Sequence, residues 1–222
     1  MTRKRALVAW SSGKDSAYAL HLARQDPGLD VVGLLTTVTD AYERVAMHGV
    51  REALLDAQAA SVGLPLVKVR IPSPCPNQVY ERAMGDAMAQ ALAQGVDHVV
   101  FGDLFLADIR AYREKQLARI GMTPLFPLWL RDTGTLAREM IADGLSAVLT
   151  CVDPKQLDRS FAGRRFDGAL LDALPSSVDP CGENGEFHTL VTAGPMFARP
   201  LRVRTGEVVE RDGFVFADVL PA

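Results

Sequence analysis

A short polar segment, Ser-Ser-Gly-Lys-Asp-Ser at residues 11–16, directly follows the apolar run of residues 6–10. Glycine lets a backbone approach an anion closely, and the N–H groups at the start of a helix attract negative charge. Lys14 and the hydroxyl groups add donors, and Asp15 beside phosphates is useful when Mg²⁺ lies between them. We therefore expect the phosphates of a bound nucleotide to contact Ser11, Ser12, Gly13, Lys14, Asp15 and Ser16.

The spacing within this loop differs from that of two common phosphate-binding loops. No glycine precedes Gly13 at the distance that Gly-x-x-x-x-Gly-Lys-Ser/Thr requires, and the dinucleotide pattern Gly-x-Gly-x-x-Gly is also missing. A capped helix start without any ligand remains the alternative, because Ser and Asp both favour such positions. The γ-phosphate chemistry of the first loop type is therefore not expected here.

A second polar segment, Cys-Gly-Glu-Asn-Gly-Glu-Phe-His-Thr, spans residues 181–189. In a turn, its carboxylates, amide, imidazole and hydroxyl can converge on one ligand. Such groups suit the binding of an amine or ammonium, or general-base work on a nucleophile. A polar turn that merely precedes a strand is the alternative. The candidate substrate-binding residues of this segment are Glu183, Asn184, Glu186, His188 and Thr189.

Other candidates lie between these two segments. Asp103 follows an apolar run, and with Asp15 it could hold Mg²⁺. Arg110 is a candidate for binding the substrate. The alternative is a simple surface ion pair with Glu114, four residues later. The further candidates for contact with the nucleotide are Thr36, His48, Gly49, Gly102 and Asp103.

Apolar, strand-like runs alternate with helical patterns over the first 125 residues. This repeat predicts an α/β fold with a doubly wound parallel sheet of the Rossmann type, in which ligands bind beyond the carboxyl ends of the strands. We expect strands at residues 6–10, 30–38, 64–71 and 97–102, and helices at residues 15–24, 50–62, 78–94 and 108–120.

The rhythm changes after residue 125. A helix at residues 133–143 and a strand at 146–152 are still expected, followed by long loops and short antiparallel strands within 201–220. We therefore predict a nucleotide-binding domain at residues 1–125 and a smaller α+β domain at residues 126–222 that binds a second substrate.

Composition limits the class of protein. The 222 residues carry a net charge of −3, which gives no support to broad nucleic-acid binding. The three cysteines are far apart and form no metal-binding or disulfide pattern, which is typical of free thiols in the cytoplasm. No apolar run approaches the roughly 18 residues of a membrane span.

The loop at residues 11–16 resembles the S-G-G-x-D-S loop of the PP-loop ATP pyrophosphatase superfamily, with Ser12 in place of the usual glycine. Together with residues 101–129 and 181–189, it makes the chain similar over nearly its full length to the diphthine–ammonia ligase-like family. The resemblance implies a HUP-type nucleotide domain that adenylates a carboxylate with ATP, after which ammonia displaces AMP. It also implies catalytic roles for Lys14, Asp15, Glu183, Glu186 and His188.

The diphthamide-forming members carry an E-G-G-E-Y-E string, whereas this chain has Asn184 and His188 at two of those positions. This variant looks like a bacterial sister branch for which amidation of a corrinoid has been suggested. The acceptor is thus a carboxylate on a small molecule or on a protein. Sulfur transfer to tRNA, a glutamine-dependent amidotransferase and a non-catalytic ATP sensor are the alternatives, and a homodimer is possible.

Overall fold

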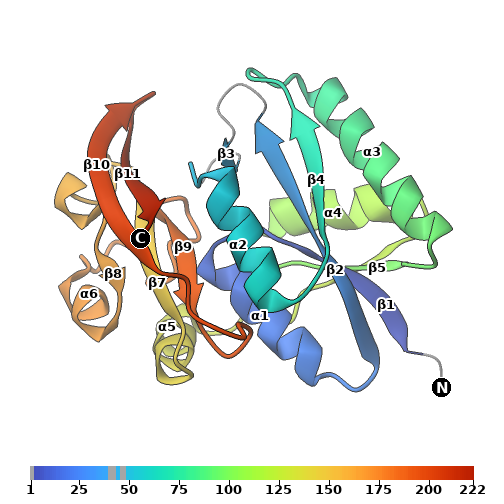
Figure 1. Ribbon diagram of the computed structural model, residues 1–222, viewed down its shortest axis with the longest axis horizontal. Coiled ribbons are helices and arrows are strands. Elements are labelled where there is room, and N and C mark those ends of the chain that lie inside the picture. The colour runs from blue at the N-terminus through green and yellow to red at the C-terminus, as the bar shows by residue number, and fades with distance from the viewer. Residues whose placement is uncertain (1–2, 40–43, 46–48) are drawn as a thin grey trace.

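A computed structural model describes residues 3–39, 44–45 and 49–222, and it contains two sheets (Figure 1). Five parallel strands form the N-terminal sheet in the order β4-β2-β1-β5-β6, and β3 pairs antiparallel with the end of β2. These strands are β1 (Lys4–Ala9), β2 (Leu29–Thr39), β3 (Arg44–Val45), β4 (Leu66–Ile71), β5 (His98–Val100) and β6 (Thr123–Leu125).

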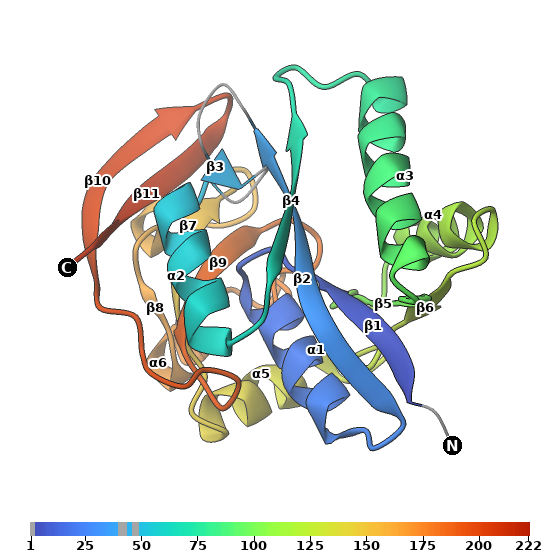
Figure 2. The same ribbon diagram turned by 45° about the vertical axis from the view of Figure 1, so that its right-hand side comes forward.

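Four helices connect these strands and cover both faces of the sheet (Figure 2). They are α1 (Lys14–Gln25), α2 (Glu52–Val62), α3 (Asn77–Ala93) and α4 (Ala107–Ala118). Successive residues of β1 point to opposite faces, so Ala6 and Val8 pack with α1 and α2, whereas Leu7 packs with residues of α3 and α4. The alternation explains why β1 reads as a continuous apolar run: both of its faces are buried.

The C-terminal region forms an antiparallel sheet around one central strand, β7 (Ser146–Val152). The strand β7 pairs with β8 (Arg165–Phe166), β9 (Phe187–Ala193) and β11 (Phe214–Pro221), and β11 pairs with β10 (Val203–Arg211). The short helices of this region are α5 (Thr133–Ala142), α6 (Gly168–Ala173) and the 3-10 turn η1 (Arg159–Phe161).

One hydrophobic core joins the two regions. Leu136 of α5, Leu149 of β7 and Phe187 of β9 belong to the same buried cluster as Ala17 and Leu20 of α1. The second sheet therefore packs on the α1 side of the first, which brings β9 close to the start of α1. The division of the chain at residue 125 stays a prediction.

The predicted fold class is confirmed, a parallel α/β sheet followed by a smaller α+β region. The expected strand at residues 97–102 is shorter, since it covers only His98–Val100. Gly102 and Asp103 consequently lie in the loop beyond the sheet edge, where they can face a ligand. No helix among the described residues is long and apolar enough to cross a membrane.

Candidate functional site

Three segments meet at the carboxyl edge of the parallel sheet. The loop at residues 11–16 follows β1, residues 101–103 follow β5, and the turn at residues 181–189 comes from the second sheet. Since β1 lies between β2 and β5, this is the switch point at which such folds bind ligands. A polar cavity of about 250 Å³ lies there, and its lining includes Ser11, Lys14, Asp15, Ser16, Gly102, Asp103, Arg113, Glu183, His188 and Thr189.

The backbone of the loop adopts a left-handed turn at Ser12, whose φ is 70°. A left-handed residue favours glycine, so neighbouring groups must hold Ser12 in place. Its carbonyl accepts hydrogen bonds from Val191 N (3.0 Å) and from Gln58 Nε2 (3.0 Å). The Ser12 side chain is fully buried and does not line the polar cavity. These contacts explain how serine is tolerated where the PP-loop pattern has glycine.

Gln58 of α2 ties the loop to the second sheet, and sequence reasoning missed it. Its amide is fully buried and donates to Ser12 O (3.0 Å) and Val191 O (2.7 Å), while it accepts from Trp10 Nε1 (3.0 Å). A buried amide with all these partners fixes its surroundings, because each lost partner would leave a desolvated polar group. The only signal in the sequence was a glutamine within a mostly apolar helical face.

A side chain of the second sheet binds a backbone N–H group at the start of α1. Lys14 N donates to Thr189 Oγ1 of β9 (3.1 Å), so one N–H that was expected to be free for an anion already has a partner. Ser16 Oγ donates to Gly13 O (3.0 Å), and Gly13 N donates to Ser11 Oγ (3.3 Å). Thr189 therefore caps the first turn of α1, in addition to lining the polar cavity.

The Lys14 side chain crosses from the loop to the turn. Its ammonium donates to Asp15 Oδ2 (2.8 Å) and to the carbonyl of Cys181, and only 2% of the side chain is exposed. It also lies 5.4 Å from the ring centre of Phe187, within cation–π range. Burial opposes its charge, but Asp15 and other nearby groups more than offset this and raise the pKa of Lys14. Lys14 thus stays a cation inside the site.

Glu183 points into the polar cavity from the turn. Its Oε1 accepts from Leu104 N (2.8 Å) and from Phe105 N (3.4 Å), in the loop that follows β5. Burial raises its pKa to about 7, and the carboxylates of Asp15 and Asp103 add to this effect. A carboxyl group that titrates near neutral pH is suited to accept and release protons during a reaction.

Glu186 lies in the same turn but faces away from the polar cavity. Its Oε1 accepts from Asp179 N (2.9 Å) and from Asn184 Nδ2 (3.0 Å), and the residue is 1% exposed. Neither Glu186 nor Asn184 lines the polar cavity. Both were expected to contact the substrate, whereas the structure places them in the hydrogen bonds that shape the turn.

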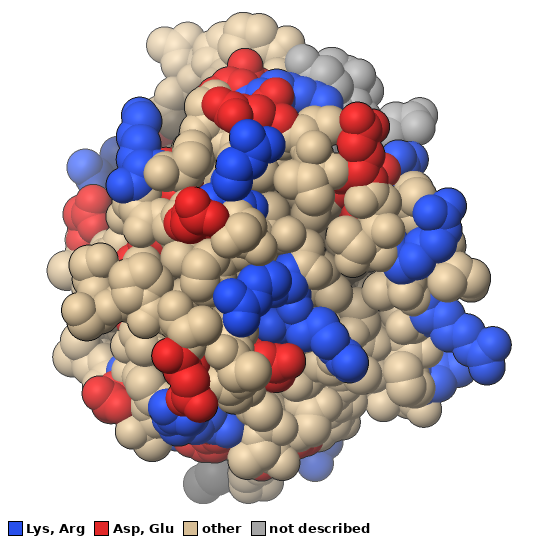
Figure 3. All heavy atoms as spheres, turned by 90° about the vertical axis from the view of Figure 1, so that its left-hand side faces the viewer, with Lys and Arg blue, Asp and Glu red and all other residues tan. Residues whose placement is uncertain are grey.

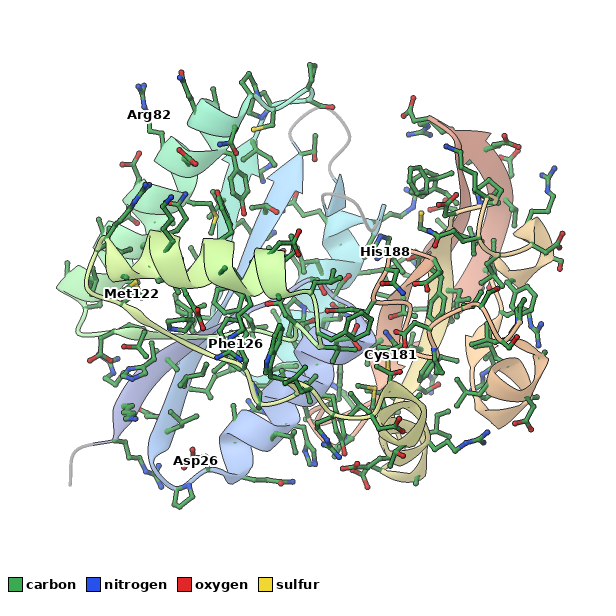
Figure 4. The ribbon with its side chains drawn as sticks, turned by 180° about the vertical axis from the view of Figure 1, so that it is seen from behind. Asp26, Arg82, Met122, Phe126, Cys181 and His188 are labelled. Carbon is green, nitrogen blue, oxygen red and sulfur yellow. The ribbon has the colours of Figure 1, made fainter. Side chains whose placement is uncertain are left out.

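His188 lines the polar cavity at the start of β9, and Figure 4 shows it with Cys181 between the two sheets. Burial lowers the pKa of His188 to about 4, and the charge of Lys14 acts in the same direction. The imidazole is therefore neutral at physiological pH.

Asp103 forms an ion pair with Arg113 of α4, a residue that sequence reasoning missed. Asp103 Oδ2 lies 2.7 Å from Arg113 Nε, and Oδ1 accepts from Nη2 (3.0 Å). Gly102 just before it is required sterically, because a Cβ there would lie 2.7 Å from the carbonyl carbon of Asp15. The tight approach of Gly102 to the loop brings Asp103 and Arg113 to the edge of the polar cavity.

The carboxylates differ in their fitness for a metal ion. Asp15 Oδ1 and Asp103 Oδ2 are both buried without a hydrogen-bond partner within the described part of the chain, but Asp103 Oδ2 lies 2.7 Å from Arg113 Nε and Asp103 Oδ1 accepts from Arg113 Nη2. Among the described residues, no group of three or more His, Cys, Asp and Glu side chains is arranged around a metal position. Mg²⁺ usually takes only one or two protein carboxylates beside phosphates, so Asp15 fits it better than Asp103.

An apolar cavity of about 410 Å³ adjoins the polar cavity and lies between α3, α4 and the ends of β1 and β2. The two cavities share Ala9, Ser11, Phe101 and Arg113 in their walls. Thr36, which was expected to contact the nucleotide, lines this apolar cavity. Its other lining residues include Trp10, Tyr80, Met84, Met88, Tyr112 and Ile120.

Two predicted residues lie away from both cavities, and a third lies outside the described residues. Arg110 donates to Glu114 Oε1 (2.7 Å) and stacks 4.6 Å from the ring centre of Trp129, outside both cavities. Gly49, with a φ of 65°, packs near Phe216 and also lines neither cavity. His48 lies outside the described residues.

Comparison with known proteins identifies the family. Residues 4–124 match the model of the diphthamide synthase N-terminal domain, and residues 132–217 match that of the C-terminal domain. The diphthine–ammonia ligase of Homo sapiens is 28% identical over 240 residues, covering 94% of this chain and 86% of the human protein. That of Danio rerio is 29% identical over 234 residues, covering 94% and 90%. The chain therefore belongs to the diphthamide synthase family, which confirms the resemblance inferred from its sequence.

Proposed function

We propose that this protein is an AMP-forming ligase that activates a carboxylate with ATP and converts it into an amide with ammonia. The observation that carries the proposal is the junction of loop 11–16 with Glu183 in one polar cavity. Relatives named diphthine–ammonia ligase support the same reaction class. The protein would therefore combine an ATP site and a proton-accepting group within one small space.

ATP would bind across the two cavities. The apolar cavity, with Thr36 and aromatic side chains in its wall, suits adenosine, and the polar cavity suits the phosphates. Lys14 and the loop backbone would lie beside the phosphates. Asp15 would hold Mg²⁺ through its unpartnered oxygen, and when bound the ion neutralises phosphate charge.

The reaction would run in two steps. First, a carboxylate oxygen of the acceptor forms a bond to the α-phosphorus, while the bond from that phosphorus to the bridging oxygen breaks and pyrophosphate leaves. Ammonia then attacks the carbonyl carbon of the acyl-adenylate, and AMP leaves with the electrons of the broken carbon–oxygen bond. Glu183 takes the proton that nitrogen must lose, as its pKa of about 7 permits.

His188 contributes to acceptor binding in this proposal. A neutral imidazole beside the carboxylates donates and accepts hydrogen bonds without adding charge. The relatives are named for diphthine. Here we expect a carboxylate on a small molecule or on a protein, with a polar group near the carboxylate that pairs with His188.

Sulfur transfer to RNA is less well supported than the ligase reaction. Burial raises the pKa of Cys151 to about 12, and the pKa of Cys181 is also raised, so neither buried thiol is a ready nucleophile. On the outer face of the C-terminal region, Lys and Arg are interspersed with Asp and Glu (Figure 3). A homodimer and a cytoplasmic location stay predictions from the sequence.

The products of ATP provide the test. The protein is incubated with ATP, Mg²⁺, ammonium and a panel of carboxylic acids that includes corrinoid acids, and nucleotides are separated by chromatography. Acceptor-dependent AMP and pyrophosphate are expected, and hydroxylamine in place of ammonium should yield a hydroxamate. Formation of ADP and phosphate would contradict the proposal, and ATP binding without turnover would favour a sensor.

A further inference from the structure

If the proposed function holds, the two cavities indicate where the α-phosphorus of bound ATP lies. It joins the nucleoside to the pyrophosphate, so it lies where the apolar cavity meets the polar one. Four residues line both cavities: Ala9, Ser11, Phe101 and Arg113. Among these four described residues, only Arg113 is charged. The position where bonds to phosphorus form and break therefore faces a guanidinium.

The guanidinium of Arg113 is held from two sides. Asp103 contacts one edge through Nε (2.7 Å) and Nη2 (3.0 Å), and the ring centre of Phe101 lies 4.4 Å from the central carbon. These contacts leave Nη1 to donate toward a ligand. The Arg113 side chain is 32% exposed and that of Asp103 is 12% exposed, so the pair borders the cavities without being sealed from them.

We propose that Arg113 is a catalytic residue that donates a hydrogen bond to a non-bridging oxygen of the α-phosphate. Negative charge increases on these oxygens while the acceptor carboxylate attacks and pyrophosphate departs with its electron pair. A preorganised guanidinium stabilises such charge more in the transition state than in bound ATP. Asp103 is a positioning residue that holds the fork of Arg113, which gives it a different task from binding Mg²⁺.

The test compares Arg113→Met and Arg113→Lys with the parent in acceptor-dependent exchange of labelled pyrophosphate into ATP. We expect Arg113→Met to lower kcat of exchange about 100-fold, with the KM for ATP changed less than threefold. Arg113→Lys keeps the charge but loses the fork and should lose about tenfold. Arg51→Met is the matched control, because Arg51 also pairs with a carboxylate, that of Asp218, and lines neither cavity.

Phosphorothioate nucleotides supply a readout that a merely structural pair would not affect. The two diastereomers of ATPαS place sulfur at different non-bridging positions of the α-phosphate. We expect the ratio of their exchange rates to change at least fivefold in Arg113→Lys, and Asp103→Asn to change it in the same direction.

Two outcomes separate the inference from the proposed function. A parent protein that forms AMP and pyrophosphate, together with an unchanged diastereomer ratio and an exchange rate within threefold in Arg113→Lys, overturns the role of Arg113 alone. A parent that forms ADP and phosphate overturns both.

Discussion

The loop at residues 11–16 and the turn at residues 181–189 meet at the polar cavity, but they are held in different ways. Groups of α2 and β9 hold the loop: Gln58 and Val191 bind its Ser12 carbonyl, and Thr189 caps Lys14 N. The turn is held partly by its own Glu186, which accepts from nearby N–H groups, and partly by Lys14 and Leu104 N, which donate to its Cys181 carbonyl and Glu183 carboxylate.

The two segments also differ in the charges they expose to a ligand. The loop offers a cation whose pKa is raised, so its charge is constant over the physiological range. The turn offers Glu183, whose pKa is about 7, and His188, whose pKa is about 4. A fixed charge suits phosphates, which are the same for every substrate of a ligase. Titrating and neutral groups suit the step that differs between acceptors.

The largest expected effect comes from Lys14→Ala, which removes the side-chain contact between the loop and the turn. It removes the buried cation beside the phosphates and the hydrogen bond to the Cys181 carbonyl. We expect acceptor-dependent AMP formation to fall about 1,000-fold, the upper range for losing one transition-state donor. Nucleotide chromatography measures the loss, and near-UV circular dichroism checks that the variant is folded.

Lys68→Ala is the control for this variant. Lys68 pairs with Glu52 and Asp56 and lines neither cavity, so AMP formation should stay within twofold of the parent. Pyrophosphate release by Lys14→Ala at the parent rate would show that the loop does not act on the phosphates.

A smaller effect is expected from Glu183→Gln, which keeps the shape of the turn. The amide oxygen still accepts from Leu104 N, but the side chain no longer takes a proton. We expect ammonia-dependent amide formation to fall about 100-fold, while pyrophosphate exchange stays within threefold. In the parent, at a fixed concentration of unprotonated ammonia, the rate of the ammonia step should rise with pH through about 7, as Glu183 ionises, and the variant should lack this rise.

Glu186→Gln separates the role of Glu183 from the structure of the turn. Glu186 lies three residues away and does not line the polar cavity, and its side chain accepts from Asp179 N and Asn184 Nδ2, so weakening these bonds should lower the urea midpoint of unfolding. The pH profile of the ammonia step should be unchanged. Loss of that profile in Glu186→Gln, with Glu183→Gln unaffected, would reverse the roles assigned to the two carboxylates.

The sequence predicted the segments of the site better than it predicted the residues that hold them. Loop 11–16 was predictable because its residue types and its place after a strand carry local information. Gln58 and Arg113 were not, because their partners lie 46 and 10 residues away and only the fold brings them together. Glu186 and Glu183 have the same chemical type, and only the direction of each side chain distinguishes their tasks.

The smallest expected effect is a pair of opposite changes in stability with pH. Glu183 has its pKa raised from 4.5 to about 7 in the folded protein, so folding is disfavoured at pH 7 and this penalty disappears as pH falls to 4.5. His188 has its pKa lowered from 6.5 to about 4, so its penalty is absent at pH 7 and develops as pH falls from 6.5 toward 4. In the parent the two trends oppose each other.

Replacing one of the two residues should reveal the pH dependence of stability that the other residue causes. Between pH 7 and pH 4.5, the unfolding free energy of His188→Gln relative to the parent should rise by about 2 kcal/mol, and that of Glu183→Gln should fall by about 2 kcal/mol. Urea titrations at four pH values measure both, and His21→Gln, an exchange at a residue lining neither cavity, is the control. Equal signs for the two variants would show that burial in the polar cavity does not shift these groups as described. Opposite signs would show that burial in the turn raises the pKa of Glu183 and lowers that of His188.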